Sequence, residues 1–195
     1  MLVNKVPLEF TVPMALRDSM VVVSMDPGRR TAFVVLEVDG HEIQVIAWGK
    51  VLISESINPG FDPQSILLNP WEARCTLEGP SCLSELLAMY RNKPQFVWEQ
   101  QRGFLELCVG APFVRHIESS GKPIDKIPPN EKFNRLGVSK DKKQSVEYAA
   151  AFFERTGPEL AQELTIRPVD EVHVDFTTLP TLACWQLCGL RSIAA

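Results

Sequence analysis

The chain lacks the long apolar runs and sorting signals that would direct it into a membrane. Its 195 residues contain no apolar stretch near the ~20 residues that a spanning helix needs. The first twenty residues hold two basic and two acidic side chains, with prolines between them. They therefore lack both the apolar core of a secretory signal and the acid-poor, Arg-rich pattern of an organelle presequence. We expect no membrane contact.

Cysteine is scarce and follows no metal-binding pattern. The five cysteines are odd in number and form no Cys-x-x-Cys pair. This argues against a zinc ribbon and against a secreted disulfide framework, so we interpret the thiols as buried core residues. We predict an intracellular, reducing compartment, and the sequence does not distinguish viral, nuclear, cytoplasmic and organellar origins. It also contains no internal repeat and no low-complexity segment.

Charge is unevenly distributed along an otherwise ordinary globular composition. The net charge is -4, yet residues 91–143 hold eleven Lys or Arg against six Asp or Glu. A basic block on an acidic background is typical of a surface that binds a polyanion, although a solvated charged face has the same composition. We predict an N-terminal arm over residues 1–18 and a single domain over residues 19–195.

One apolar stretch, residues 20–25, leads directly into Asp26 and a Pro-Gly turn. This is the pattern of a buried central strand that presents a carboxylate at its end. Arg29 and Arg30 follow at once, and an acid held beside cations indicates a site for a metal or a phosphate. A plain strand followed by an Asp-Pro-Gly turn explains the same residues.

The next strands follow from periodicity and turn signals. Residues 32–38 and 42–48 flank Asp39-Gly40, a strong hairpin signal, so the domain opens with a three-stranded antiparallel meander. Residues 95–99 form a short apolar strand that again ends in an acid, Glu99. Ligands in α/β proteins bind at the carboxyl ends of such strands. A further strand is expected over 122–127.

The segments between and after these strands are predicted as follows. Residues 54–80 are irregular, and residues 82–92 form a helix with Ser81 as its N-cap. A helix from about 104 to 119 is weakened by Pro112. Further helices are expected from about 146 to 157 and 158 to 164, and a terminal helix follows residue 176.

Carboxylates recur where a shared site is expected. Asp26 and Glu99 end two strands, and three more acids follow near the last helix: Asp170, Glu171 and Asp175. Converging carboxylates repel one another unless a cation neutralises them, and hard oxygen ligands suit Mg²⁺ or Mn²⁺. Two such ions can clamp a phosphodiester during hydrolysis. Glu171 and Asp175 are four residues apart and would share a helix face.

Four stretches together resemble the ribonuclease H-like superfamily, in particular the RuvC-like Holliday junction resolvases and their poxviral and fungal mitochondrial relatives. Residues 24–28, Ser-Met-Asp-Pro-Gly, look like the opening strand with its first acid. Residues 98–101, Trp-Glu-Gln-Gln, look like the strand with the second acid. The basic segment from Pro129 to Val146 and the acids of 170–175 are similar to the remaining two motifs.

The resemblance implies a fold, an activity and a site. The fold would be α/β and ribonuclease H-like, with a mixed five-stranded sheet flanked by helices, namely the antiparallel meander followed by parallel strands. The protein would be a homodimeric Mg²⁺- or Mn²⁺-dependent crossover junction endodeoxyribonuclease, a hydrolase of DNA recombination and repair that acts on branched DNA with two metal ions. The implied metal ligands are Asp26, Glu99, Glu171 and Asp175. Lys142 or Lys143 would contact the phosphate, and the implied DNA-binding residues are Arg29, Arg30, Arg102, Lys132, Arg135, Lys140 and Lys143.

The closing acids depart from the family pattern. The family usually carries two acids three residues apart, and here the residue three before Asp175 is Val172. Glu171, Asp170 and His173 are the candidates for that role. A degenerate site would leave a branched-nucleic-acid-binding module without catalysis. A third hypothesis is a nucleotide-binding domain of the actin and sugar-kinase type, but its second domain copy and glycine-rich nucleotide loop are not evident.

Overall fold

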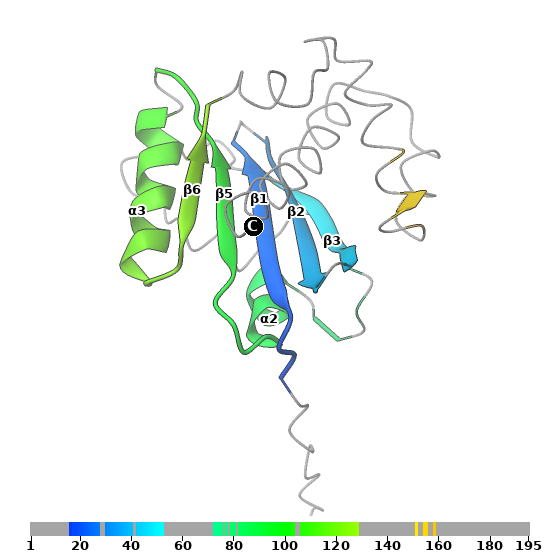
Figure 1. Cartoon of the computed structure of the whole chain (residues 1–195). Coiled ribbons are helices and arrows are strands. Elements are labelled where there is room, and N and C mark those ends of the chain that lie inside the picture. The colour runs from blue at the N-terminus through cyan, green and yellow to red at the C-terminus, as the bar shows by residue number, and fades with distance from the viewer. Residues whose placement is uncertain are drawn as a thin grey trace, which may run out of the picture.

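The strands of the computed structural model form one six-stranded sheet. Figure 1 shows helices beside this sheet. The structure describes residues 16–27, 30–40, 42–52, 72–75, 77, 79–80, 82–103, 106–128, 151, 154–155 and 158. Within these residues, no helix is both long enough and apolar enough to span a bilayer.

The sheet has the strand order β4-β3-β2-β1-β5-β6. Figure 1 shows β6, β5, β1, β2 and β3 side by side. The strands are β1 Met20–Asp26, β2 Arg30–Asp39, β3 Glu42–Leu52, β4 Glu72–Cys75, β5 Gln95–Glu99 and β6 Ile124–Ile127. Strands β1, β2 and β3 pair antiparallel, whereas β5 runs parallel to β1 and β6 runs parallel to β5. The predicted meander followed by parallel strands is therefore confirmed.

The β2–β3 hairpin forms where its turn signal predicts it. Asp39 still pairs with Glu42, so the loop consists of Gly40 and His41. Gly40 has a φ of 55°, in the left-handed region that glycine adopts without steric cost. The register shifts between Val35 and Leu36, which is a bulge in the pairing with β3.

Strand β4 is an addition to the predicted sheet. It lies within residues 54–80, which the proline and glycine punctuation predicted as irregular, and it pairs with Ala47 to Lys50 of β3. Four residues on a sheet edge carry little periodicity of their own. The strand forms because the edge of β3 offers backbone groups for pairing. The residues of β4 alone do not indicate that this edge is nearby.

The main core lies between one face of the sheet and two helices, α2 Leu83–Ala88 and α3 Ala111–Ser119. Alternate residues of β1, β2 and β5 point to this face, among them Val23, Phe33 and Trp98. Phe113 of α3 stacks on Trp98 with ring centroids 4.5 Å apart, and its ring meets Phe96 edge-on at 6.2 Å. The opposite face of the central strands is buried as well.

Helix α2 corrects one prediction and shortens another. Its N-cap is Cys82 and not Ser81, because the Glu85 backbone N–H donates to the Cys82 sulfur at 3.5 Å. The helix ends at Ala88 rather than near residue 92. Tyr90 instead forms a parallel bridge with Arg17. This pairing with a residue distant in sequence replaces the helical backbone conformation that the apolar spacing predicted there.

Pro112 reshapes the predicted helix over 104–119 without breaking it. A π-helix, η1 Glu106–Gly110, leads directly into α3, and Pro112 lies in the first turn of α3. Proline has no N–H to donate, and the first turn of a helix is where that loss costs least. Downstream, residues 151, 154, 155 and 158 are helical, in the two segments predicted as helices. The remainder of those segments and the predicted terminal helix lie outside the described residues.

We expect Phe113→Ala to lower the free energy of unfolding by about 3–5 kcal/mol, because it removes a fully buried ring that contacts two other aromatic rings. The matched control is Leu107→Ala, since Leu107 is 71% exposed and should change stability by less than about 0.5 kcal/mol. Urea unfolding followed by tryptophan fluorescence measures both. Equal losses in the two variants would contradict this position of the core.

Candidate functional site

The parallel pairing of β1 with β5 brings Asp26 and Glu99 together. Met25 pairs with Trp98, and Asp26 and Glu99 are the next residues of their strands. Both carboxylates therefore occupy the carboxyl ends of neighbouring parallel strands. Adjacent strands lie about 4.8 Å apart, so the two side chains leave the sheet at almost the same place.

The two acids also share a face of the sheet. Ser24 pairs with Val97, and Asp26 and Glu99 each follow two residues later, which returns a side chain to the same face. This is the face opposite α2 and α3, because Val23, Met25 and Trp98 point into the core with those helices. Asp26 and Glu99 thus lie side by side on one face of the sheet, and their predicted role as metal ligands stays a prediction.

Burial makes this pair electrostatically costly. Glu99 is 6% exposed and Asp26 is half-buried. Two carboxylates in the same register on neighbouring strands repel each other, and burial weakens the screening by water. A divalent cation between them would relieve that repulsion.

A glutamine from the loop after β5 completes the described part of the site. The Gln101 Nε2 group donates to the Asp26 Oδ1 atom at 3.4 Å. The Gln101 backbone N–H donates to the Glu106 Oε2 atom at 3.1 Å. Sequence reasoning quoted Gln101 within the Trp-Glu-Gln-Gln stretch but gave it no role, and it gave none to Glu106. The local signal for Gln101 was its position two residues past a strand-end acid. No comparable local signal marked Glu106.

The donor set fits a hard divalent cation. Carboxylate oxygens from two elements converge, which is the ligand chemistry that Mg²⁺ and Mn²⁺ prefer. Ser24 lies two residues before Asp26 on the same face, and its fully buried hydroxyl has no hydrogen-bond partner among the described residues. The described residues contain no group of three or more acidic, His or Cys side chains placed to hold a metal. Of the four predicted ligands, only Asp26 and Glu99 lie within the described residues.

The other predicted site residues have different outcomes. Arg102 is exposed, three residues past Glu99, at the same end of the sheet. Arg30 begins β2 at that end as well, opposite the carboxyl end of β1. The remaining predicted residues lie outside the described residues: Arg29, Lys132, Arg135, Lys140, Lys142, Lys143, Asp170, Glu171, His173 and Asp175.

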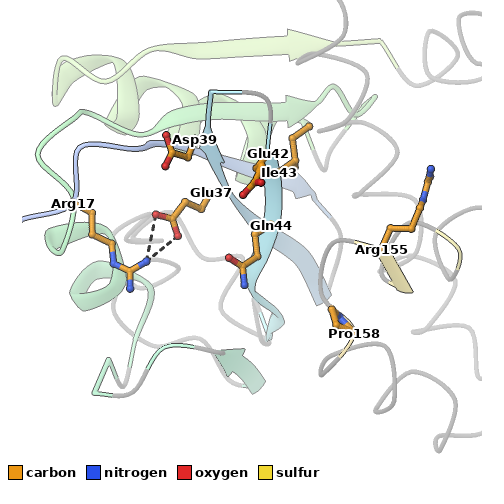
Figure 2. Close-up of a pocket in the computed structure, with 8 residues that line it drawn as sticks. All are labelled: Arg17, Glu37, Asp39, Glu42, Ile43, Gln44, Arg155 and Pro158. Carbon is orange, nitrogen blue, oxygen red and sulfur yellow. Dashed lines mark hydrogen bonds and ion pairs between the residues drawn. The ribbon is translucent and has the colours of Figure 1, made fainter.

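A polar pocket of about 550 Å³ lies at the end of the sheet opposite Asp26 and Glu99 (Figure 2). Met20 pairs with Val38 there, whereas Asp26 pairs with Ala32 at the other end. The residues that line this pocket are Arg17, Glu37, Asp39, Glu42, Ile43, Gln44, Arg155 and Pro158. Acids outnumber cations around it only slightly, but three carboxylates make it a poor site for a phosphate backbone.

Glu37 at this pocket fixes the start of the domain. The Arg17 Nη1 group lies 3.0 Å from the Glu37 Oε2 atom, and the Ser19 hydroxyl donates to Glu37 at 2.6 Å. Figure 2 draws the Arg17–Glu37 contacts as dashed lines. The Arg17 backbone also forms a bridge with Tyr90. The Arg17 N–H donates to the Met89 carbonyl at 3.0 Å, and the Arg91 N–H donates to the Arg17 carbonyl at 2.9 Å. The rest of the predicted arm lies outside the described residues, and its boundary stays a prediction.

The strand order, the strand directions and the helices beside the sheet define a ribonuclease H-like α/β fold. The chain is similar to the structure of RuvC from Thermus thermophilus, with a TM-score of 0.52 and 17% sequence identity over 87% of this chain and 97% of that chain. T. thermophilus RuvC in complex with a Holliday junction substrate matches with a TM-score of 0.41 and 16% identity, over 87% and 96%. No protein-family model and no curated protein sequence matches. At this identity the likeness establishes the fold.

We expect Tyr90→Phe to reduce the loss of stability at high pH. Burial raises the pKa of Tyr90 above its usual value of 10.0, and the negative charge of Glu37 adds to this effect while Arg17 opposes it. Above pH 10 the unfolded chain ionises this tyrosine whereas the folded chain keeps its proton, so the free energy of unfolding falls by up to ~1.4 kcal/mol per pH unit. Below pH 10 the shift has no effect.

The measurement is guanidinium unfolding of both proteins at pH 8, 9.5, 10 and 11. The wild type should lose more stability than Tyr90→Phe between pH 10 and 11, and the two should change in parallel between pH 8 and 9.5. Parallel behaviour over the whole range would contradict the burial of the Tyr90 hydroxyl beside Glu37.

Proposed function

We propose that this protein is a metal-dependent, structure-selective endodeoxyribonuclease that resolves four-way DNA junctions by paired phosphodiester hydrolysis. The observation that carries the proposal is the position of Asp26 and Glu99, in register and on one face at the carboxyl ends of β1 and β5. The ribonuclease H-like fold and its likeness to RuvC support it. Residues far apart in the chain thus supply two carboxylates to one place.

The proposed chemistry assigns a role to each residue. Asp26 and Glu99, together with Glu171 and Asp175, would hold Mg²⁺ or Mn²⁺. Two such ions, when bound, would activate a water and stabilise the leaving oxygen. Hydrolysis would bond the water oxygen to phosphorus, break one phosphorus–oxygen ester bond and leave the water proton on the departing alcohol oxygen. Lys142 offsets charge on the phosphate during that step.

We place the DNA-binding surface at the acid-pair end of the sheet, where the proposed reaction would occur. Arg102 and the start of β2 at Arg30 lie at this end, whereas three carboxylates surround the pocket at the other end. Phosphate contacts would orient the junction, and selection would follow junction shape rather than base identity. Two symmetric cuts in one junction require a homodimer. We also propose that the protein works in a reducing, intracellular compartment.

We expect Asp26→Asn to reduce cleavage of a synthetic four-way junction in Mg²⁺ at least about a hundredfold, because it removes a ligand and its charge from the reacting centre. Junction binding should persist. The matched control is Asp39→Asn, which changes a strand-end aspartate on the neighbouring strand at the opposite end of the sheet. It should cleave as the wild type does.

Gel-based cleavage and binding assays give both quantities, and thermal unfolding verifies that each variant is folded. Full activity of Asp26→Asn would refute the site. Binding of junctions by the wild type without cleavage in Mg²⁺ or Mn²⁺ would instead identify a non-catalytic binding module. ATP binding without affinity for DNA would favour a nucleotide-binding domain.

We expect Arg102→Gln to weaken junction binding and to lower the slope of log affinity against log salt by about 1, because one phosphate contact is lost. The control is Arg115→Gln. Arg115 is also exposed, but it lies on α3 and its Nε group donates to the Ala111 carbonyl at 3.2 Å. Fluorescence anisotropy at several salt concentrations measures the slope. An unchanged slope in Arg102→Gln would remove Arg102 from the proposed DNA surface.

A further inference from the structure

We propose that Gln101 is a positioning residue for the acid pair, and that Glu106 in η1 holds Gln101 in place. The consequence for metal binding rests on the proposed function, whereas the contacts themselves do not. Gln101 connects two segments that are far apart in sequence, because its side chain reaches Asp26, 75 residues earlier. The geometry points to a relay that runs from Glu106 through Gln101 to Asp26.

The first contact restricts the orientation of the Asp26 carboxylate. The Gln101 Nε2 group donates to the Asp26 Oδ1 atom at 3.4 Å, a long hydrogen bond. A carboxylate offers about four lone-pair sites on two oxygens. The Gln101 amide donates to one of these two oxygens, Oδ1.

The charge of the donor matters as much as its position. An amide is neutral, so Gln101 orients Asp26 without neutralising the pair that Asp26 forms with Glu99. A lysine or arginine at position 101 would offset the same negative charge that attracts a divalent ion. A glutamine at this position is therefore compatible with a cation bound at the pair.

The backbone of Gln101 is fixed on both sides. The Gln100 N–H donates to the Ile127 carbonyl of β6 at 2.9 Å, which extends the sheet by one residue. The next N–H, that of Gln101, donates to the Glu106 Oε2 atom at 3.1 Å. Two consecutive N–H groups thus bind different elements, and this sets the direction in which the Gln101 side chain leaves the loop.

The π-helix explains how Glu106 reaches the loop. The Glu106 carboxylate lies directly over Gly110, where an added Cβ would be 2.5 Å from its Oε2 atom and 2.7 Å from its Cδ atom. Only glycine leaves room for it there. The loop itself turns at Gly103, which has a φ of 65°, and Leu107 N donates to the Gly103 carbonyl at 3.2 Å. π-helical turns are frequent at functional sites.

The test measures Mn²⁺ binding by isothermal titration calorimetry in the absence of DNA, so that it does not depend on turnover. Gln101→Leu should raise the Mn²⁺ dissociation constant about 10–100-fold, the usual loss when a residue that orients a metal ligand is removed. Glu106→Ala and Gly110→Ala should each weaken binding in the same direction. Glu106→Gln keeps an acceptor oxygen for the Gln101 N–H and should retain most of the affinity.

The matched control is Gln95→Leu. Gln95 also donates from its amide to a carboxylate, Asp125 Oδ2 at 3.0 Å, but it lies at the other end of β5. Its removal should leave Mn²⁺ affinity unchanged. Loss of affinity in Gln95→Leu equal to that in Gln101→Leu would overturn the inference, because the effect would then be general to the sheet.

The outcomes separate this inference from the proposed function. Wild-type affinity in Gln101→Leu with weakened binding in Asp26→Asn would overturn the positioning role and leave the metal site intact. Unchanged affinity in Asp26→Asn would overturn the metal site itself. If Gln101→Leu fails to fold, as judged by thermal unfolding, Glu106→Ala compared with Glu106→Gln decides the matter.

Discussion

Parallel pairing between β1 and β5 is the constraint on which the rest of the site depends. It sets Met25 beside Trp98, and so Asp26 and Glu99 lie at the same end and on the same face of the sheet. The same register places Trp98 where it stacks on Phe113 of α3. Because side chains alternate along a strand, a slip of one residue between β1 and β5 would separate the two carboxylates and also disrupt the core.

Packing and charge thus act on opposite faces of the same strands. On one face, aromatic and branched side chains bury their surface against α2 and α3 and stabilise the register. On the other, that stability holds two like charges close together, an arrangement that would otherwise be unfavourable. Under the proposed function, a bound cation would relieve this repulsion, and the neutral Gln101 contact is consistent with that proposal.

Much of the fold followed from local patterns. The apolar run of β1, the Asp39-Gly40 turn and the alternation in β3 predicted the meander, and a strand-end acid marked both β1 and β5. The edge strand β4 and the end of α2 did not follow. Each depends on a partner distant in sequence: the open edge of β3 for β4, and Arg17 for Tyr90. Short segments take such structures from their neighbours rather than from their own propensity.

The sequence by itself determined which strands end in a carboxylate, because apolar runs, prolines and glycines act over a few residues. Only the tertiary structure decided that Asp26 and Glu99 share a face, since that depends on a register between strands separated by some seventy residues. It alone also placed Gln101 against Asp26 and Glu106 over Gly110. Hydrogen bonds of this kind are set by the path of a loop, and no local pattern of residue types encodes that path.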